Sequence, residues 1–170
     1  SRVIAQADSS RGARSDTDVR RDIEHALTCA EQNNRGHTPS DEQLTRLALS
    51  LTDARVRDTL YALAVGDRAG EAEALWAALA RCLPDPWRVE ALVLLAFSAY
   101  SRGDGPLTGI SLDAALRCAP EHKMAGMMDQ ALQAGMRPEQ IRELAQTGYR
   151  LAQELGVRLP RRRTFGRRAG

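Results

Sequence analysis

Residues 89–120, VEALVLLAFSAYSRGDGPLTGISLDAALRCAP, decide the fold because they place two apolar helical stretches on either side of one sharp turn. Residues 91–100 are apolar except for Ser98, which predicts a helix that is buried on nearly every side. Gly103 supplies the left-handed backbone conformation that reverses a chain, and the small side chain of Ala96 allows a second helix to approach closely. The stretch therefore predicts a helical hairpin with a central first helix.

This hairpin resembles one tetratricopeptide repeat, a helix pair of about 34 residues. The matching positions are Leu92, Leu95 and Ala96 in the first helix, Gly103 and Asp104 in the turn, Leu112, Ala115 and Leu116 in the second helix, and the closing Pro120. Thr108 departs from the alanine of the repeat. The flanking segments fit the repeat poorly, so the resemblance implies one helical hairpin and identifies no ligand.

Helical periodicity continues on both sides of the hairpin. Residues 17–32 repeat apolar side chains at steps of three and four, and Ser40 with Gln43 forms a capping box at the start of another helix. A third helix is expected to be capped by Thr52 or Asp53 and to end at Gly66, and Pro86 is expected at the first position of the central helix. A last helix is expected from Pro138 to its C-terminal cap Gly156. The prediction is an all-α fold of about eight helices in antiparallel hairpins, either tetratricopeptide-like or an irregular bundle.

The composition divides the chain into three parts. Residues 1–16 are polar without a period and are expected to be disordered, residues 17–156 form a single helical domain, and residues 157–170 form a flexible Arg-rich tail. The longest apolar run has ten residues, against about 20 needed to cross a bilayer. No signal peptide is recognisable, and the opening serine suggests a piece of a longer protein.

Three cysteines at wide spacing predict buried free thiols and a reducing, cytoplasmic location. They are Cys29, Cys82 and Cys118. Of the 24 basic residues 23 are arginine, a bias that indicates a GC-rich genome before it indicates a nucleic-acid ligand.

Residues 44–136 are similar to the C-terminal half of an uncharacterised actinobacterial domain family, catalogued by the number four-one-nine-two. The similarity lies in the segments LALSLTDARVRDTLYAL, AEALWAALARCLPDPWRVEALVLLAFSAYSRGDG and SLDAALRCAPEHKMAGMMDQALQAGMRP. Members of that family carry a further N-terminal region, so the resemblance implies that such a region is missing here. It implies an actinobacterial, cytoplasmic protein and transfers no catalytic or binding residue.

No pattern of catalytic or metal-binding residues is recognisable, so the sequence predicts neither an enzyme nor a cofactor. His25, His37 and His122 lack a second ligand at helical spacing, and Ser111 lies outside any nucleophile turn. Arg102 to Asp104 reads RGD, which also invites an adhesion interpretation. The hairpin explains this tripeptide as a turn.

Two sets of apolar residues are either buried in the domain or exposed as candidates for protein binding. The inner face of the first hairpin helix would present Val93, Phe97 and Tyr100, which suits an apolar or helical ligand better than a peptide carboxylate. A second set shares a later helical face and consists of Met124, Met127 and Met128. The sequence favours burial for both sets and leaves the open groove as the alternative.

The tail offers a nucleic-acid site or a solvated terminus. Its candidates are Arg161, Arg162, Arg163, Phe165, Arg167 and Arg168, which suit phosphate contacts and base stacking. Without the six arginines of residues 158–168, the chain keeps 18 basic against 22 acidic residues, so the positive balance belongs to the tail.

The sequence leaves three hypotheses for function. The leading one is a noncatalytic protein-interaction domain of a larger cytoplasmic protein, whose partner is another protein or the missing N-terminal region of its own chain. The alternative is nonspecific binding of DNA or RNA through the tail. The third makes this domain the regulatory half of an enzyme. The oligomeric state is not predicted.

Overall fold

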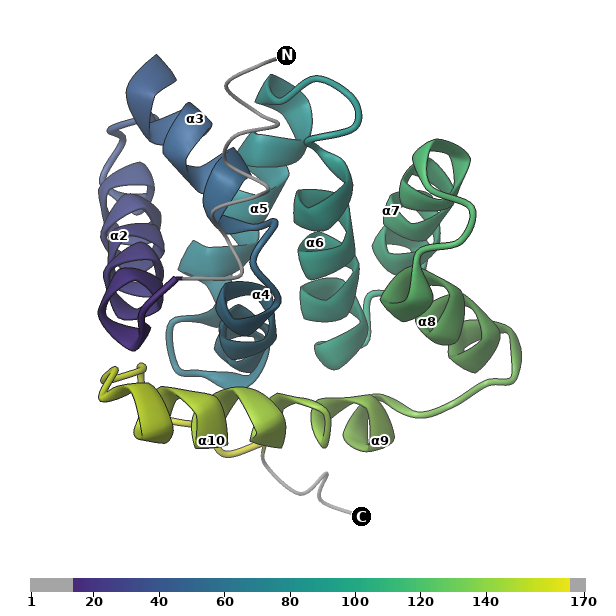
Figure 1. The fold of residues 1–170 in the computed structure, drawn as a ribbon. Coiled ribbons are helices and arrows are strands. Elements are labelled where there is room, and N and C mark those ends of the chain that lie inside the picture. Colours follow the sequence, from purple (N-terminus) through teal and green to yellow (C-terminus); the bar gives the residue numbers. More distant parts are fainter. Residues whose placement is uncertain (1–13, 166–170) are drawn as a thin grey trace.

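The computed structural model describes residues 14–165, which form an all-α fold, as the sequence predicts (Figure 1). The only bridge between extended segments in this range pairs Gly66 with Arg162. The elements are α2 (Asp16–Asn34), α3 (Asp41–Ser50), α4 (Ala54–Leu60), the 3-10 helix η2 (Tyr61–Val65), α5 (Ala69–Cys82), α6 (Val89–Ser101), α7 (Gly105–Cys118), α8 (Lys123–Gln133), α9 (Pro138–Arg142) and α10 (Ala145–Leu155).

Helix α6 is the centre of the core. Every residue of α6 except Glu90 is buried, because α5, α7, α8, α9 and η2 all pack against it. Its apolar residues leave no polar face for solvent, which is the pattern that predicts a central helix. Figure 1 shows α6 between α5 on one side and α7 on the other.

The turn between α6 and α7 is the one that the sequence predicts. Gly103 has a φ of 83°, and the Asp104 carboxylate accepts a hydrogen bond of 2.9 Å from the Leu107 N–H at the start of α7. Arg102 donates two hydrogen bonds of 2.8 and 3.0 Å to Glu73 on α5. Gly103 thus contributes its backbone conformation to the turn, Asp104 caps α7, and Arg102 ties the turn to α5, which accounts for the tripeptide as a turn.

The helix starts on the N-terminal side follow their local sequence. Ser40 and Gln43 form both bonds of the predicted capping box, at 3.2 and 2.9 Å. Ser15 and Asp18 form the same arrangement at the start of α2. The expected disordered segment lies outside the described residues except for residues 14–16, which belong to this helix start.

Three expected helix boundaries were wrong. The helix expected from Asp53 to Gly66 is α-helical only to Leu60 and then tightens into η2. Pro86 does not start α6, because residues 85–88 form a turn in which the Arg88 N–H bonds the Pro84 carbonyl, and α6 begins at Val89. The helix expected over residues 138–156 is two helices, α9 and α10.

Helices α9 and α10 cover one end of the core. α9 and α10 run across the lower ends of α2, α4 and α6 in Figure 1, and α10 packs on α4 and η2. Gly148 makes this packing possible, because a Cβ atom there would lie 2.7 Å from the Ala62 Cβ and 2.8 Å from the Asp58 carbonyl oxygen. A glycine at this position lets two helical backbones approach to a distance that any other residue would prevent.

Residues 157–165 also pack against the domain, and we call them the C-terminal strap. Val157 is buried, and Leu159 and Phe165 pack on the core. The flexible tail was expected to start at residue 157, but the packed part of the chain extends to Phe165. The physical reason is that the strap satisfies its backbone in a pairing with the end of η2, described below.

Within the described residues, no helix combines the length and the apolar composition required to cross a membrane.

Candidate functional site

One surface hollow lies where α3, the end of α5 and the start of α6 meet, and we call it the Trp87 groove. It has a volume of about 390 Å³. Its lining residues come from α3 and from the α5–α6 connection: Asp41, Leu44, Thr45, Ala48, Leu49, Cys82, Leu83, Pro84 and Trp87. Leu44 and Trp87 are half-buried, and Cys82 is exposed.

The Trp87 groove is apolar along most of its length. Six of its side chains are aliphatic or aromatic hydrocarbon surfaces, and Asp41 and Thr45 are its polar groups. Asp41 lies in the first turn of α3, which gives that end of the groove a negative charge. A hollow of this chemistry accommodates apolar side chains.

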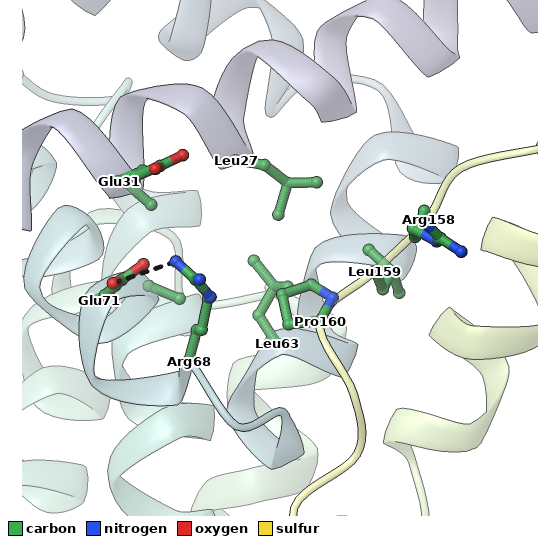
Figure 2. Close-up of a pocket in the computed structure, with 10 residues that line it drawn as sticks. Leu27, Glu31, Leu63, Arg68, Glu71, Arg158, Leu159 and Pro160 are labelled. Carbon is green, nitrogen blue, oxygen red and sulfur yellow. Dashed lines mark ion pairs between the residues drawn. The ribbon is translucent and has the colours of Figure 1, made fainter.

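A second hollow, which we call the Leu159 pocket, lies between α2, η2, α5 and the C-terminal strap. It has a volume of about 290 Å³. Its lining residues are Leu27, Ala30, Glu31, Leu63, Arg68, Glu71, Ala72, Arg158, Leu159 and Pro160. Figure 2 shows Glu31, Arg68 and Glu71 on one side of the pocket, and Leu159, Pro160 and Arg158 of the strap on the other.

Three charged residues of the Leu159 pocket have ion-pair partners within it or beside it. Arg68 lies 3.6 Å from Glu71 in an ion pair, and Glu71 also accepts a hydrogen bond of 3.2 Å from Asn34. Glu31 pairs with Arg35 at 2.7 Å. Three charged residues of the pocket, Glu31, Arg68 and Glu71, are thus held in ion pairs, and the strap forms the opposite wall.

The C-terminal strap is held by backbone pairing. The Asp67 N–H donates to the Arg161 carbonyl at 2.7 Å, and the Arg163 N–H donates to the Val65 carbonyl at 2.6 Å. The Tyr149 hydroxyl of α10 donates to the Pro160 carbonyl at 3.3 Å. These bonds surround the bridge between Gly66 and Arg162, so the strap runs antiparallel to the end of η2.

The inner face of α6 is buried in this structure, as the sequence favours, and the open groove that was its alternative is not formed. Val93, Phe97 and Tyr100 are buried because α9 and η2 cover that face of the helix. The Phe97 ring packs edge-on against Tyr61 at 5.1 Å, and the Tyr100 hydroxyl donates to the Met136 carbonyl at 2.7 Å. The burial alternative therefore holds for this set.

The methionine set divides between core and surface. Met128 is buried, Met124 is half-buried against the core, and Met127 is 37% exposed on the outer side of α8. These three side chains do not form a continuous surface. The cysteines divide as well, since only Cys29 is buried, against the prediction for all three.

The described arginines of the tail are exposed, whereas its aromatic side chain, Phe165, is in contact with two arginines. Arg161, Arg162 and Arg163 are exposed, and none of the ion pairs found among residues 14–165 includes them. The Phe165 ring lies between the guanidinium groups of Arg142 and Arg163, at 3.6 and 4.4 Å. Phe165 is therefore occupied in the strap. Arg167 and Arg168 lie outside the described residues.

One polar cluster joins α4, α6 and α8. The His122 side chain caps α8 by accepting from the Ala125 N–H through Nδ1, so its Nε2 carries the proton that bonds Glu90 at 2.9 Å. Arg57 approaches the other oxygen of Glu90 at 3.5 Å. The cluster ties three helices together, and it contributes no residue to either hollow. In residues 14–165 no three His, Cys, Asp or Glu side chains converge as a metal site would require.

Sequence reasoning missed both hollows because each combines segments far apart in the chain. Two residues gave a weak local signal for the Trp87 groove. Leu44 is an apolar residue near the start of an amphipathic helix, and Trp87 is a large aromatic residue that follows a proline. No local signal marked the strap, since an arginine-rich segment with proline and glycine is typical of a solvated terminus.

Residues 1–139 match the family described as a domain of unknown function, DUF4192. No curated protein and no solved structure matches the chain. The family match covers most of the chain and is wider than the resemblance over residues 44–136. It ends within α9, before α10 and the C-terminal strap. On this match, the chain belongs to the DUF4192 family.

Proposed function

We propose that this chain is a noncatalytic protein-interaction domain and that the Trp87 groove is its docking surface. The observation that carries the proposal is the groove itself, an apolar hollow of about 390 Å³ that is open at the protein surface. Apolar hollows with an aromatic side chain at the edge are frequent anchoring points for partner proteins.

The groove chemistry defines the partner segment. Leu44, Leu49 and Trp87 provide contact surface for one or two apolar side chains, and Asp41 favours a basic residue beside them. An amphipathic helix or an extended segment with that pattern meets both requirements. The proposal accounts for a surface feature that no structural role inside the domain explains.

A photo-crosslinking experiment tests the proposal. Cys82 is exposed within the groove, so a maleimide-linked benzophenone on Cys82, in a Cys118→Ser background, places the reactive group where a partner would lie. We expect one protein from the source organism to crosslink reproducibly and to be identified by mass spectrometry. Leu49→Glu should abolish the crosslink, and Ile110→Glu, which alters an exposed apolar residue on α7, should retain it.

Crosslinking that is the same for both variants, or the absence of any specific product, would contradict the groove as docking surface.

A second candidate function is the association of nucleic acid with the arginines of the strap. The observation that favours it is the run of three consecutive exposed arginines, Arg161, Arg162 and Arg163, none of which enters an ion pair found within residues 14–165. Phosphate contacts by such arginines do not depend on sequence and weaken steeply as salt increases. Because Phe165 is engaged by two arginines, this candidate relies on charge rather than on base stacking.

Salt-dependent binding of a duplex oligonucleotide tests the second candidate. We expect the affinity to fall by orders of magnitude between about 50 and 200 mM salt. Replacing Arg161, Arg162 and Arg163 by glutamine should reduce the slope of log K against log salt by about 2 to 3. The same replacement at the exposed Arg81, Arg117 and Arg150 serves as the charge-matched control. Equal slopes for the two triple variants would reject the strap as the contact.

A further inference from the structure

The C-terminal strap is bound to this domain in the way that an extended peptide is bound to a receptor. Two backbone hydrogen bonds, of 2.7 and 2.6 Å, flank the bridge of Gly66 with Arg162. Gly66 has an extended backbone, with φ −80° and ψ 164°, so it offers a short strand edge at the end of η2. Addition of an extended peptide to an open edge is a general mode of peptide recognition.

Side chains at both ends of the strap provide the anchors. Leu159 and Pro160 line the Leu159 pocket beside Leu27 and Leu63, as Figure 2 shows. At the other end, the Phe165 ring contacts the Arg142 guanidinium at 3.6 Å. The residues between these anchors point their charged side chains to the surface. Recognition therefore depends on the backbone and on two apolar anchors, with a spacing of five residues from proline to phenylalanine.

The receptor side of this contact belongs to elements that are formed without the strap. Leu27 lies on α2, Leu63 on η2, Arg142 on α9 and Tyr149 on α10. Each of these elements is fixed by its own packing on the rest of the core. If the strap leaves, the domain keeps an apolar pocket, an unpaired edge at Val65 to Asp67, and a hydroxyl donor at Tyr149.

We propose that this surface is a peptide-binding site, that the C-terminal strap is its intramolecular ligand, and that an extended peptide with a Leu-Pro pair followed by an aromatic residue five positions after the proline replaces the strap. Because the strap is tethered, its effective concentration is in the millimolar range and it excludes weak competitors. A partner gains access when the strap is released. The proposal concerns a surface separate from the Trp87 groove and does not depend on it.

The test uses full-length chains and a fluorescein-labelled peptide with the sequence of residues 157–165, VRLPRRRTF. A release variant combines Leu159→Asp with Phe165→Ala, which removes both anchors from the strap and leaves the receptor residues unchanged. The matched control combines Arg161→Ala with Arg162→Ala, because those exposed side chains lie on the same strap between the anchors and neither contacts Phe165. A scrambled peptide of the same composition controls for contact driven by charge.

We expect the peptide to bind the release variant at least about tenfold more tightly than the wild type, and the control variant to behave as the wild type does. Hydrogen exchange provides a second readout, because the Asp67 N–H is bonded to the strap. Its exchange should be slow in the wild type, fast in the release variant, and slow again when the peptide is added.

Three results would overturn the proposal: equal affinity of the peptide for wild type and release variant, absence of binding to the release variant, or equal binding of the scrambled peptide. If the double substitution prevents folding, the single change Phe165→Ala replaces it, since Phe165 is only half-buried. Its affinity for the peptide should then lie between those of the wild type and a fully released chain, and no gain over the wild type would likewise count against the site.

Discussion

A single glycine sets the distance between α10 and the rest of the core. The Cα of Gly148 faces the backbone of α4, with the Asp58 and Thr59 carbonyl oxygens at 2.8 and 2.9 Å from the position that a Cβ would occupy. Backbone atoms cannot move aside as the end of a flexible side chain can. Gly148→Ala is therefore expected to destabilise the protein by about 1 to 3 kcal/mol through overpacking.

Thermal or urea unfolding measures this change, and Gly126→Ala is the matched control. Gly126 also lies within a helix, α8, but an added Cβ would meet nothing within 4 Å. Alanine should stabilise the protein there by up to about 1 kcal/mol, because it has the higher helix propensity. If both substitutions shift stability in the same direction, the close approach of α10 to α4 is not as the structure has it.

We expect His25 to make stability depend on pH as the pH falls below the ordinary histidine pKa of about 6.5. Desolvation by burial is the main cause that lowers the pKa of His25, Arg46 lowers it further, and Asp22 opposes both. In the unfolded chain the pKa is about 6.5, so the unfolded state binds the proton first as pH falls. The contribution of neutral His25 is thus fully present above that pH and is lost as pH falls through the lower pKa of the folded state.

We expect the Tm of the wild type to fall between pH 7 and pH 5, and His25→Gln to remove part of that fall. His37 lies exposed in the connection from α2 to α3, so His37→Gln should leave the slope of Tm against pH unchanged. A slope that is the same for the wild type and His25→Gln would show that burial does not hold this imidazole neutral.

The pairing of α6 with α7 is the element-scale contact on which the hairpin depends. Ala96 is fully buried on α6, and Ala115 is fully buried on α7. Ala96→Phe adds a ring where no space exists, and should cost about 1 to 3 kcal/mol. Ile110 is 68% exposed on α7, so Ile110→Phe is the control and should change stability little. An unchanged melting temperature for Ala96→Phe would contradict the tight pairing of these helices.

The sequence predicted well those elements whose conformation is determined by a few consecutive residues. Ser40 and Gln43 form a capping box with one another, and Gly103 and Asp104 form their turn and cap within four residues. The helix boundaries that it predicted wrongly are determined by packing against residues far away in the chain. The change from α4 to η2 occurs where α10 and α6 pack on residues 61–65, a contact that local propensity does not contain.

The candidate sites show the same division. Periodicity identified Val93 and Phe97 as apolar face residues, but it contains no information on which helix covers that face. The Trp87 groove requires α3 to lie beside the end of α5, and the Leu159 pocket requires residues 159–160 to meet α2. Both are products of tertiary packing. The tetratricopeptide resemblance stays a prediction beyond the hairpin of α6 and α7.

At the scale of the whole molecule, the family match and the packed core have different C-terminal limits. The match ends at residue 139, whereas α10 buries Ala145, Gly148, Ala152 and Leu155 against the rest of the domain. α10 lies across the ends of α2 and α4 and packs along η2 (Figure 1). The residues that complete this core therefore include some that lie outside the matched region.

A chain that ends at residue 139 should consequently fail to form the same core. It would expose Leu60 and residues 61–65 of η2, and it would lose the burial of Ile141, Leu155 and Val157. Each such aliphatic side chain contributes about 1.5 to 3 kcal/mol on burial, and the total stability of a domain is about 5 to 15 kcal/mol. The summed loss of burial free energy is comparable with the total free energy of unfolding, so we expect broad, noncooperative unfolding and binding of a hydrophobic dye at neutral pH.

A chain that ends at Phe165 is the control, because it retains every contact described and should unfold as the full chain does. A sharp transition in the shorter chain, within a few degrees of the longer one, would mean that the helices up to residue 139 close their own core and that α10 is an addition to it.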